Sequence, residues 1–284
     1  MTKIGLVLEG GAMRGLYTAG VLDVFLDNNI NIDGIIGVSA GALFGANYYS
    51  KQRGRALRYN KKYCKDKRYI SIHSLITTGN IVNKDFAFYK VTNELDPFDD
   101  EEFIKTNKDF YVVITNVETG MPEYINIKNS TVKNLEVLRA TSAMPIVSKM
   151  VEINNHKYLD GALADSIPVT KAIDMGYDKI IVILTRPLEY RKKPFSKLES
   201  LFIKLKYRKY PKLVKAILNR YSNYNECLEK IIDLESKKEI FVIRPSRDLN
   251  ISRLEKDESK LQEVYDLGIN DAKKHMKRLI KFLK

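Results

Sequence analysis

Residues 34–45 read GIIGVSAGALFG, an apolar run in which Gly37 and Gly41 flank Ser39. An apolar strand signal leads into the serine, and the helix signal AGALFGANYYSKQRG (residues 40–54) follows it. In the pattern G-x-S-x-G, the glycines leave room where a strand and the next helix approach each other, and the turn exposes the serine hydroxyl. The first N–H groups of that helix are unpaired and favour a negative charge beside the serine. The stretch therefore predicts a nucleophilic serine at a strand-to-helix turn, with a simple helix cap as the alternative.

Strand and helix signals alternate outward from this turn. Apolar runs of strand length occupy residues 3–11, 32–38, 109–117, 122–127, 149–153, 156–160, 179–185 and 239–245. Helical spacing occupies residues 13–29, 40–54, 134–143, 169–175, much of 195–236, and 255 to the end. This alternation in the first third of the chain predicts an α/β fold with a parallel sheet and right-handed crossovers. Residues 51–100 are polar and mixed, and we expect them to form a lid or an insertion.

Length and composition indicate a globular protein. The chain has 284 residues, of which 44% are hydrophobic, enough for a sizeable core. Its first residues run directly into an apolar strand, so we expect no signal peptide. No apolar run reaches the roughly 18 residues that would span a bilayer. Cys64 and Cys227 are far apart and have no metal-ligand spacing, so we expect a cytoplasmic protein without a metal or other cofactor.

A second glycine cluster follows the first strand. In EGGAMRG (residues 9–15), Gly10, Gly11 and Gly15 lie at the carboxyl end of that strand, where parallel sheets bind ligands. The spacing does not fit the dinucleotide pattern G-x-G-x-x-G, and no lysine follows Gly15 as a phosphate-binding loop requires. We expect the backbone N–H groups here to form a hole for an oxyanion. Arg14 either adds positive charge to this hole or is an exposed arginine without a role.

The sequence does not indicate a histidine as the general base for the serine. The chain contains three histidines, His73, His156 and His275. The one well downstream of the serine, His275, lies on a basic terminal helix, where we expect it to be solvated or half-packed. By contrast, Asp160 ends an apparent strand in YLDGALADSIPV and precedes Gly161, a turn that presents the side chain. Burial would raise the pKa of this carboxylate until it can accept the serine proton, although Asp-Gly alone indicates no more than a turn.

Three segments, in this order, resemble the signature blocks of the patatin-like phospholipase family: EGGAMRG (residues 9–15), GVSAG (residues 37–41) and LDGALADSIP (residues 159–168). The segment ATSAMP (residues 140–145) also resembles a turn of that family, with Thr141 in place of the usual serine. The resemblance covers about residues 4–185. It implies a three-layer α/β/α fold with a mostly parallel central sheet, and a Ser-Asp dyad without a catalytic histidine.

The same resemblance implies a role for each matching residue. Ser39 is then the nucleophile and Asp160 the general base of a reaction through an acyl-enzyme. The oxyanion hole aligns with Gly10, Gly11, Ala12 and Ala40. The family often has a third glycine where this chain has Ala12. The supporting motif positions are Arg14, Gly15, Gly37, Gly41 and Gly161.

The function implied is that of a phospholipase A-type lipid acyl hydrolase, acting on a lipid or another acyl ester. Two alternatives stay open on the sequence. One is a soluble esterase or thioesterase. The other is a non-catalytic protein that binds lipid or regulates a partner and keeps a vestigial site, although binding alone requires neither Ser39 nor Asp160.

Positive charge is concentrated after residue 185. The chain has a net charge of +13, and residues 186–220 carry twelve Lys and Arg against two Glu. The α/β pattern also gives way to basic helices near this point. We expect residues 1–185 to form a catalytic α/β domain and residues 186–284 a basic, mainly helical region that packs on the core or extends it.

The segment FSKLESLFIKLKYRKY (residues 195–210) carries an apolar stripe at helical spacing, interleaved with lysines and arginines. The stripe consists of Leu198, Leu201, Phe202 and Leu205. Such a basic amphipathic helix suits an anionic membrane and predicts peripheral contact through residues 191–215 at the inner membrane surface. Packing of the stripe on the core is the alternative. No recognition motif or aromatic platform accompanies the charge, so we expect no nucleic-acid partner.

Overall fold

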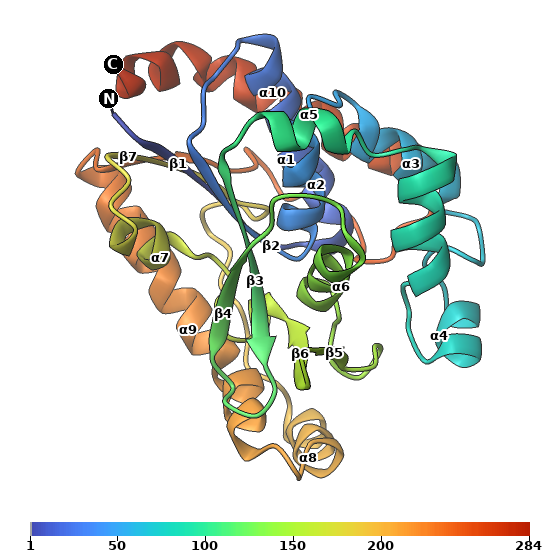
Figure 1. The fold of residues 1–284 in the computed structure, drawn as a ribbon. Helices are drawn as coiled ribbons and strands as arrows, with labels where there is room; N and C mark the ends of the chain where they lie inside the picture. The colour runs from blue at the N-terminus through green and yellow to red at the C-terminus, as the bar shows by residue number, and fades with distance from the viewer. Residues whose placement is uncertain (1) are drawn as a thin grey trace.

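The centre of the fold is a mostly parallel sheet. The computed structural model describes residues 2–284, and its eight-stranded sheet has the order β5-β6-β3-β2-β1-β7-β8, with β4 paired to β3. The strands are β1 (Ile4–Leu8), β2 (Gly34–Val38), β3 (Asp109–Asn116), β4 (Pro122–Asn126), β5 (Val151–Ile153), β6 (His156–Asp160), β7 (Lys179–Ile183) and β8 (Ile240–Ile243). The neighbours β3, β2, β1, β7 and β8 run parallel, whereas β4 and β6 run antiparallel to β3. The predicted α/β class is confirmed (Figure 1).

Helices connect these strands. The α-helices are α1 (Gly15–Asp27), α2 (Ala40–Tyr49), α3 (Arg55–Tyr63), α4 (Ile72–Thr78), α5 (Asp100–Lys105), α6 (Val132–Thr141), α7 (Val169–Asp174), α8 (Lys197–Lys206), α9 (Pro211–Ser236) and α10 (Glu258–Leu283). The 3-10 helices are η1 (Ala12–Arg14) and η3 (Gly161–Leu163), and η2 (Lys84–Leu95) is a π-helix. None of the helices in residues 2–284 is both long enough and apolar enough to cross a membrane.

Both faces of the sheet are covered, which gives three layers. Leu6 and Leu8 of β1 pack in one core with side chains of α1, α2 and α10, whereas Val7 packs in a second core with α7 and α9. The central strands read as near-continuous apolar runs because parallel strands are buried on both faces. In Figure 1, α7 and α9 lie on one side of the sheet, and α1, α2 and α10 lie on the other. The α/β/α arrangement is therefore as predicted, and the region after residue 185 contributes β8 to the sheet and α10 to one face.

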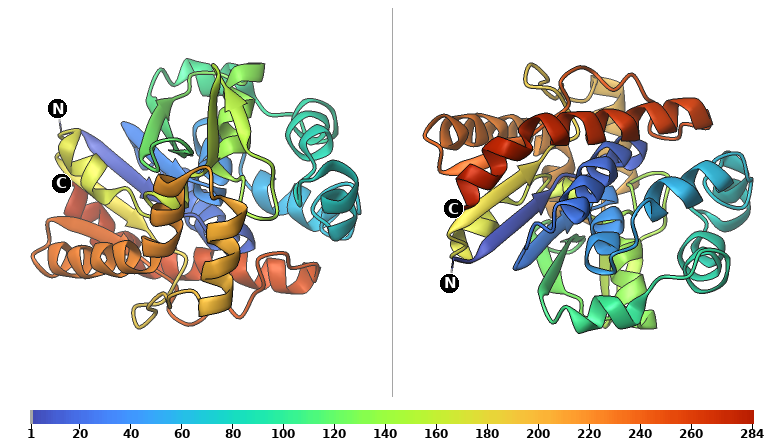
Figure 2. Two further views of the ribbon diagram at one scale, coloured as in Figure 1. Left: turned by 90° about the horizontal axis from the view of Figure 1, so that it is seen from below. Right: turned by 90° about the horizontal axis from the view of Figure 1, so that it is seen from above.

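The helix α10 approaches α1 closely enough to require glycine on both sides. A Cβ at Gly20 would lie 2.2 Å from the carbonyl oxygen of Tyr265, and a Cβ at Gly268 would lie 2.1 Å from that of Tyr17. Figure 2 (right) shows α10, in red, crossing α1, in blue. This contact attaches the C-terminal helix to the first helix of the chain.

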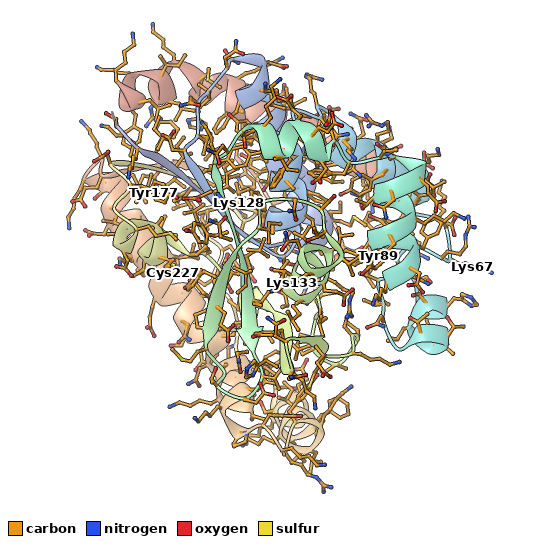
Figure 3. The ribbon with its side chains drawn as sticks, in the orientation of Figure 1. Lys67, Tyr89, Lys128, Lys133, Tyr177 and Cys227 are labelled. Carbon is orange, nitrogen blue, oxygen red and sulfur yellow. The ribbon has the colours of Figure 1, made fainter. Side chains whose placement is uncertain are left out.

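Tyr177, which Figure 3 labels, fills space left by two glycines at the other end of the sheet. Gly5 of β1 pairs with Gly34 of β2. A Cβ at Gly5 would lie 2.6 Å from the Tyr177 ring, and a Cβ at Gly34 would lie 1.8 Å from its hydroxyl oxygen. The tyrosine side chain thus lies across the two central strands and positions the loop between α7 and β7 against them.

Several element ends differ from the sequence-based prediction. The expected strand at 3–11 ends at Leu8, because the following glycines leave the sheet. The expected helix at 40–54 ends at Tyr49, and the helical stretch at 195–236 is divided into α8 and α9, with Pro211 at the start of α9. Residues 51–100 form an insertion between α2 and β3 that contains α3, α4 and η2.

The apolar stripe of α8 does not pack on the core. Its side chains, Leu198, Leu201, Phe202 and Leu205, are between 51% and 80% exposed. The opposite face of the helix is buried instead, through Ile203 and Tyr207. The Tyr207 hydroxyl also accepts a hydrogen bond from the Ile146 N–H at 2.8 Å. The alternative, in which the stripe packs on the core, is therefore wrong, because Ile203 and Tyr207 perform that packing.

Candidate active site

The strands β2 and β6 meet end to end along one edge of β3. The strand β2 pairs with β3 as far as Val38, which lies opposite Val113. The strand β6 takes the next position of β3, where Asp160 lies opposite Ile114. The other edge of β3 is occupied by β4. Because Ser39 directly follows β2 and Asp160 is the last residue of β6, the ladder brings these two side chains together.

Ser39 has a strained backbone, with φ 53° and ψ −125°. Residues other than glycine rarely adopt a positive φ, and such strain persists only where the surrounding structure fixes it. A Cβ at Gly37 would lie 2.6 Å from the Cα atom of Ala42. A Cβ at Gly41 would lie 2.6 Å from the carbonyl oxygen of Leu8. The two glycines of G-x-S-x-G thus allow the strand, the turn and the helix to pack closely around the serine.

The Ser39 hydroxyl donates a hydrogen bond to Asp160 Oδ2 at 3.0 Å. The second oxygen of the carboxylate, Oδ1, accepts the Ala162 N–H at 2.9 Å. Ser39 is only 8% exposed and Asp160 only 6%. Burial raises the pKa of Asp160, while Arg220 and the bonds from Ala162 and Ser39 oppose the rise. A buried carboxylate of raised pKa that already accepts a hydroxyl hydrogen bond can take the proton from that hydroxyl.

Thr141 holds the strained turn through a hydrogen bond with the backbone of Ser39. The Ser39 N–H donates to Thr141 Oγ1 at 2.8 Å, and the threonine hydroxyl donates to the carbonyl oxygen of Val113. Thr141 is fully buried. It occupies the position at which the family resemblance expects serine, and either residue supplies the hydroxyl that this network needs.

We expect Thr141→Val to lower the free energy of unfolding by about 1–3 kcal/mol, because the buried Ser39 N–H would lose its acceptor without a change in side-chain volume. Thr141→Ser is the matched control. It keeps the hydroxyl and removes one methyl group, for a smaller loss of about 0.8 kcal/mol. Urea unfolding measures the free energy of unfolding of both variants, and we expect the larger loss for the valine variant. A valine variant as stable as the serine variant would contradict this expectation.

The glycine loop after β1 passes directly over the serine. A Cβ at Gly10 would lie 2.9 Å from the Cβ atom of Ser39. Within residues 2–284, the N–H groups of Gly10 and Gly11 find no hydrogen-bond acceptor. Ala40 is the first residue of α2, so its N–H also lacks a partner inside the helix. Ala12 has a φ of 51°, which accounts for the frequent glycine at this position in the family.

The other expected motif positions serve close packing or carry charge. A Cβ at Gly15 would lie 2.9 Å from the Cβ atom of Ala40, and one at Gly161 would lie 2.1 Å from the carbonyl oxygen of Val113. Arg14 is partly buried, and its Nε atom has no hydrogen-bond partner among residues 2–284. Burial and the charge of Arg186 lower the pKa of Arg14 to about 10.

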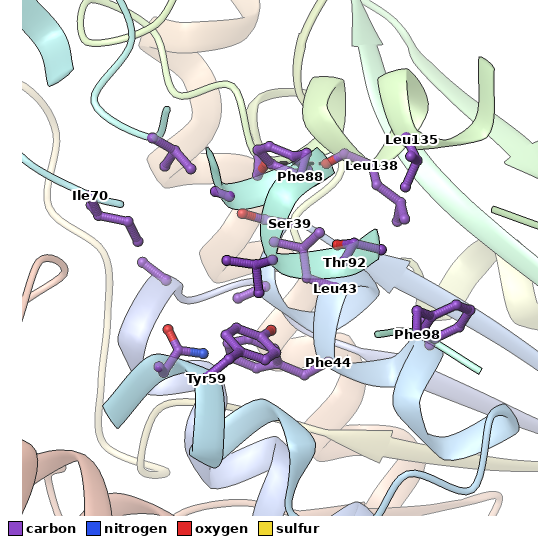
Figure 4. A pocket seen from close by; sticks show the side chains of 18 of the residues that line it. Ser39, Leu43, Phe44, Tyr59, Ile70, Phe88, Thr92, Phe98, Leu135 and Leu138 are labelled. Carbon is purple, nitrogen blue, oxygen red and sulfur yellow. Dashed lines mark hydrogen bonds between the residues drawn. The ribbon is translucent and has the colours of Figure 1, made fainter. Parts of the chain in front are cut away.

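An apolar pocket opens beside Ser39 (Figure 4). It contains about 1180 Å³ of unoccupied space, part of it open to solvent. Its walls carry mainly apolar and aromatic side chains from α2, α3, η2 and α6, among them Leu43, Phe44, Tyr59, Phe88, Leu135 and Leu138. The insertion at residues 51–100, in which the sequence indicates no individual helix or strand, supplies much of this wall. Arg253, from the loop before α10, also lines the pocket, and no sequence motif indicates it.

None of the three histidines, all of which lie in the described part of the chain, lines this pocket. His73 and His156 are exposed. His275 is half-buried, with its ring edge-on to Phe241 at a centroid distance of 6.2 Å. The acceptor beside the Ser39 hydroxyl is therefore a carboxylate.

Two family models match this chain. The model described as patatin-like phospholipase matches residues 6–173, and one described as a domain of unknown function, DUF6363, matches residues 210–284. The first match contains the serine turn, the glycine loop and β6. The second contains α9, β8 and α10.

Curated relatives cover the chain to different extents. The uncharacterized protein YjjU of Escherichia coli (strain K12) is 29% identical over 273 residues, which are 94% of this chain and 75% of that protein. The probable lipid hydrolase 463L of Invertebrate iridescent virus 6 is 24% identical over 79% of this chain and 86% of its own length. Lysophospholipase nte1 of Aspergillus oryzae is 25% identical over 64% of this chain, but the match spans only 12% of that protein.

Proposed function

This chain belongs to the patatin-like phospholipase family, and from that premise we propose that it is a lipid acyl hydrolase with Ser39 as nucleophile and Asp160 as general base. The observation that carries the proposal is the 3.0 Å hydrogen bond from the serine hydroxyl to the carboxylate, made at a strained turn beside an apolar pocket. The names of two relatives, a lysophospholipase and a probable lipid hydrolase, support the same class of reaction.

The first step forms an acyl-enzyme. Ser39 Oγ attacks the ester carbonyl carbon while its proton passes to Asp160 Oδ2. The carbonyl oxygen becomes negative, and the free N–H groups of the glycine loop and of Ala40 stabilise it. The tetrahedral intermediate then collapses, the C–O bond to the alcohol breaks, and the leaving alkoxide takes the proton from Asp160.

The second step returns the enzyme to its starting state. A water molecule gives a proton to Asp160 and attacks the acyl carbon of the ester on Ser39. The same N–H groups stabilise the second oxyanion. When the bond to Ser39 Oγ breaks, the serine recovers its proton from Asp160 and the fatty acid leaves. One carboxylate thus acts first as base and then as acid in each half of the reaction.

The pocket favours a long acyl chain over a short one. Burial of each methylene group contributes roughly 0.8 kcal/mol. Release of fatty acid from a long-chain phospholipid and from a short soluble ester separates the candidate functions. Hydrolysis of both supports a lipid acyl hydrolase, hydrolysis of the short ester alone supports a soluble esterase, and binding without hydrolysis supports a non-catalytic protein.

The lipid surface is expected to meet α8. The exposed stripe of this helix is bordered by Lys197, Lys204 and Lys206. Among the described residues, the basic stretch 186–220 makes ion pairs only through Arg186 and Arg191. The lysines of α8 are therefore available to anionic lipid, and each cation near such a surface adds about 1 kcal/mol.

The position of α8 also suits delivery of lipid to the pocket. The Lys206 ammonium donates to the carbonyl oxygen of Ile146 at 3.1 Å. Ile146 lies two residues after Met144, which lines the pocket. A surface that holds α8 thus lies beside one wall of the pocket, and the apolar stripe and the lysines together fit an anionic bilayer.

We expect the triple variant Leu201→Ser, Phe202→Ser, Leu205→Ser to bind anionic vesicles at least about 10-fold more weakly, because the apolar anchor is lost. Ile280→Ser, an exposed apolar residue of α10, is the matched control and should bind like the wild type. Co-sedimentation with vesicles measures both. Equal binding by the triple variant, or wild-type binding that ignores anionic lipid content, would contradict the proposal.

A further inference from the structure

Three cations from outside the patatin-like match gather at the catalytic end of the sheet. They are Lys192 in the loop after β7, Arg220 on α9, and Arg253 in the loop between β8 and α10, and we call them the cation cluster. Both loops follow the carboxyl ends of parallel strands. Ser39 follows the carboxyl end of another parallel strand, β2. Open parallel sheets bind ligands at the carboxyl ends of their strands.

Two members of the cation cluster, Arg220 and Arg253, lie near the proposed dyad. The Arg220 Nε–H donates to the carbonyl oxygen of Ala162, the residue whose N–H is bonded to Asp160. Arg253 lines the pocket into which Ser39 opens. Both arginines are close enough to Asp160 to oppose the rise of its pKa that burial causes.

Lys192 is fixed by residues of α9. Asn225 accepts the Lys192 N–H at 2.8 Å and donates to the Lys192 carbonyl oxygen at 3.0 Å. The ammonium lies 4.5 Å from the centre of the Tyr224 ring. Burial and the charges of Arg220 and Arg253 lower the pKa of Lys192 to about 7, although Glu9 opposes them. The three positive charges therefore interact with one another.

The charges of Asp160 and Glu9 oppose the lowering of the pKa of Arg220, but neither carboxylate forms an ion pair with a member of the cation cluster. In the part of the chain that the structure describes, none of its members forms an ion pair within 4.0 Å. Glu9 already accepts the Thr185 N–H at 2.6 Å and the Tyr224 hydroxyl at 2.8 Å. Arg14 adds a further charge that lowers the pKa of Lys192. Partly buried positive charge without a partner is unfavourable, and an anion would relieve it.

We propose that the cation cluster binds the phosphate group of an anionic acyl lipid, beside the ester that Ser39 attacks. This rests on the proposed function. Guanidinium groups bind phosphate oxygens through paired, charge-assisted hydrogen bonds, whereas a trimethylammonium head group would be repelled by the same charges. The site then selects lipids with a net negative head group over zwitterionic or neutral ones. Arg220 and Arg253 lie in the matched domain of unknown function, which thereby gains a role in substrate choice.

The kinetic test compares two substrates that differ only in the phosphate. They are a 1-acylglycerol 3-phosphate and the 1-acylglycerol of the same chain length, each below its micelle concentration. The readout is the ratio of their kcat/KM values. We expect Arg253→Gln and Lys192→Gln each to lower this ratio by about 10-fold or more, the effect of losing one hydrogen bond to a charged group. An unchanged ratio in both variants overturns the proposal.

Arg191→Gln is the matched control for charge. Arg191 is the exposed neighbour of Lys192 and pairs at the surface with Glu229 at 2.7 Å. Its variant removes one positive charge from the same loop without touching the cation cluster. We expect the substrate ratio of Arg191→Gln to equal that of the wild type. A drop as large as that of Lys192→Gln would mean that overall charge, and not a built site, sets the preference.

A binding measurement tests the phosphate site of the cation cluster independently of hydrolysis. Calorimetry on the Ser39→Ala protein compares sn-glycerol 3-phosphate with inorganic phosphate, and we expect Arg253→Gln to weaken binding of the former by about 10-fold or more. Equal binding of inorganic phosphate with no change in the substrate ratio would identify a free-phosphate site and overturn the head-group proposal. Cluster-dependent binding without any hydrolysis by the wild type would contradict the proposed function and leave the anion site standing.

Discussion

Replacing Ser39 by alanine, or Asp160 by asparagine, is expected to lower ester hydrolysis by at least about 10³-fold. The alanine variant has no atom that can form the acyl-enzyme. The asparagine variant has no base for the serine proton, and no histidine is in place to substitute for it. Fatty-acid release from a short ester and from a phospholipid measures both losses.

Both variants should stay folded. Asparagine retains the oxygen that accepts the Ala162 N–H at 2.9 Å. Burial raises the pKa of Asp160, so the folded state binds its proton more tightly than the unfolded state does. The carboxylate therefore contributes stability only while it is protonated, and this contribution is lost as pH rises through the raised pKa. At neutral pH, Asp160→Asn should not lower the free energy of unfolding.

Asp165→Asn is the matched control for this result. The Asp165 carboxylate is also raised in pKa by burial, and it accepts the Tyr124 hydroxyl at 2.7 Å instead of a serine hydroxyl. We expect its variant to keep most of the hydrolytic activity. Comparable activity of the Asp160 and Asp165 variants, both folded, would remove Asp160 from the mechanism.

Gly41→Ala is expected to lower hydrolysis by about 10²-fold, because it displaces the serine from the glycine loop. A Cβ at Gly41 would lie 2.6 Å from the carbonyl oxygen of Leu8 and 2.8 Å from that of Glu9. These are backbone atoms of β1 and of the turn toward Gly10, so the start of α2 must move away. We expect the free energy of unfolding to fall by about 1–3 kcal/mol as well.

Gly45→Ala is the control, one turn further along α2. A Cβ there would meet the end of the Leu8 side chain at 2.5 Å, and its next neighbour, a ring atom of Phe110, lies at 3.5 Å. A side-chain end can rotate away where a backbone carbonyl cannot. The Gly45 variant should therefore keep near-wild-type kcat/KM. Equal activity of both variants would show that the close approach at Gly41 does not position the serine.

The α/β/α fold could be predicted from the sequence because its central strands are short apolar runs bounded by glycines. GIIGV is buried along its length and IGLVL from Gly5 onward, and each leads into a helix with apolar spacing. The insertion at 51–100 could not be predicted in this way. Helix α4 buries only Ser74 and η2 has a π-helical period, so no 3.6-residue pattern emerges from these two segments. Helix α3 buries five of its nine residues, but three of these are polar or charged or small, so few apolar positions mark it in the sequence.

The sequence places Ser39 at a turn, but pairing it with Asp160 depends on the family resemblance. The contact is made by two strands, 121 residues apart at these positions, that share an edge of β3, and no local pattern encodes that register. The direction in which the apolar stripe of α8 faces could not be predicted from the sequence, for a different reason. An apolar face at helical spacing has the same pattern whether it meets a core or a membrane, and only the buried Ile203 and Tyr207 decide its direction.

The cation cluster leaves no trace in the sequence. Lys192, Arg220 and Arg253 come from three elements and stand among many other lysines and arginines in a chain of net charge +13. Their shared position follows from the order of β7 and β8 in the sheet and from the packing of α9. Tertiary structure alone separates these three from the solvated charges around them.

The most direct test of the Ser39–Asp160 dyad is labelling with a fluorophosphonate, which reacts with activated serines, followed by peptide mapping of the wild type and of Asp160→Asn. A Ser39–Asp160 dyad predicts a single adduct on the peptide that contains Ser39, largely absent from the folded Asp160→Asn protein. An adduct on a different serine, equal labelling of the variant, or no adduct on the folded wild type would contradict a Ser39–Asp160 dyad.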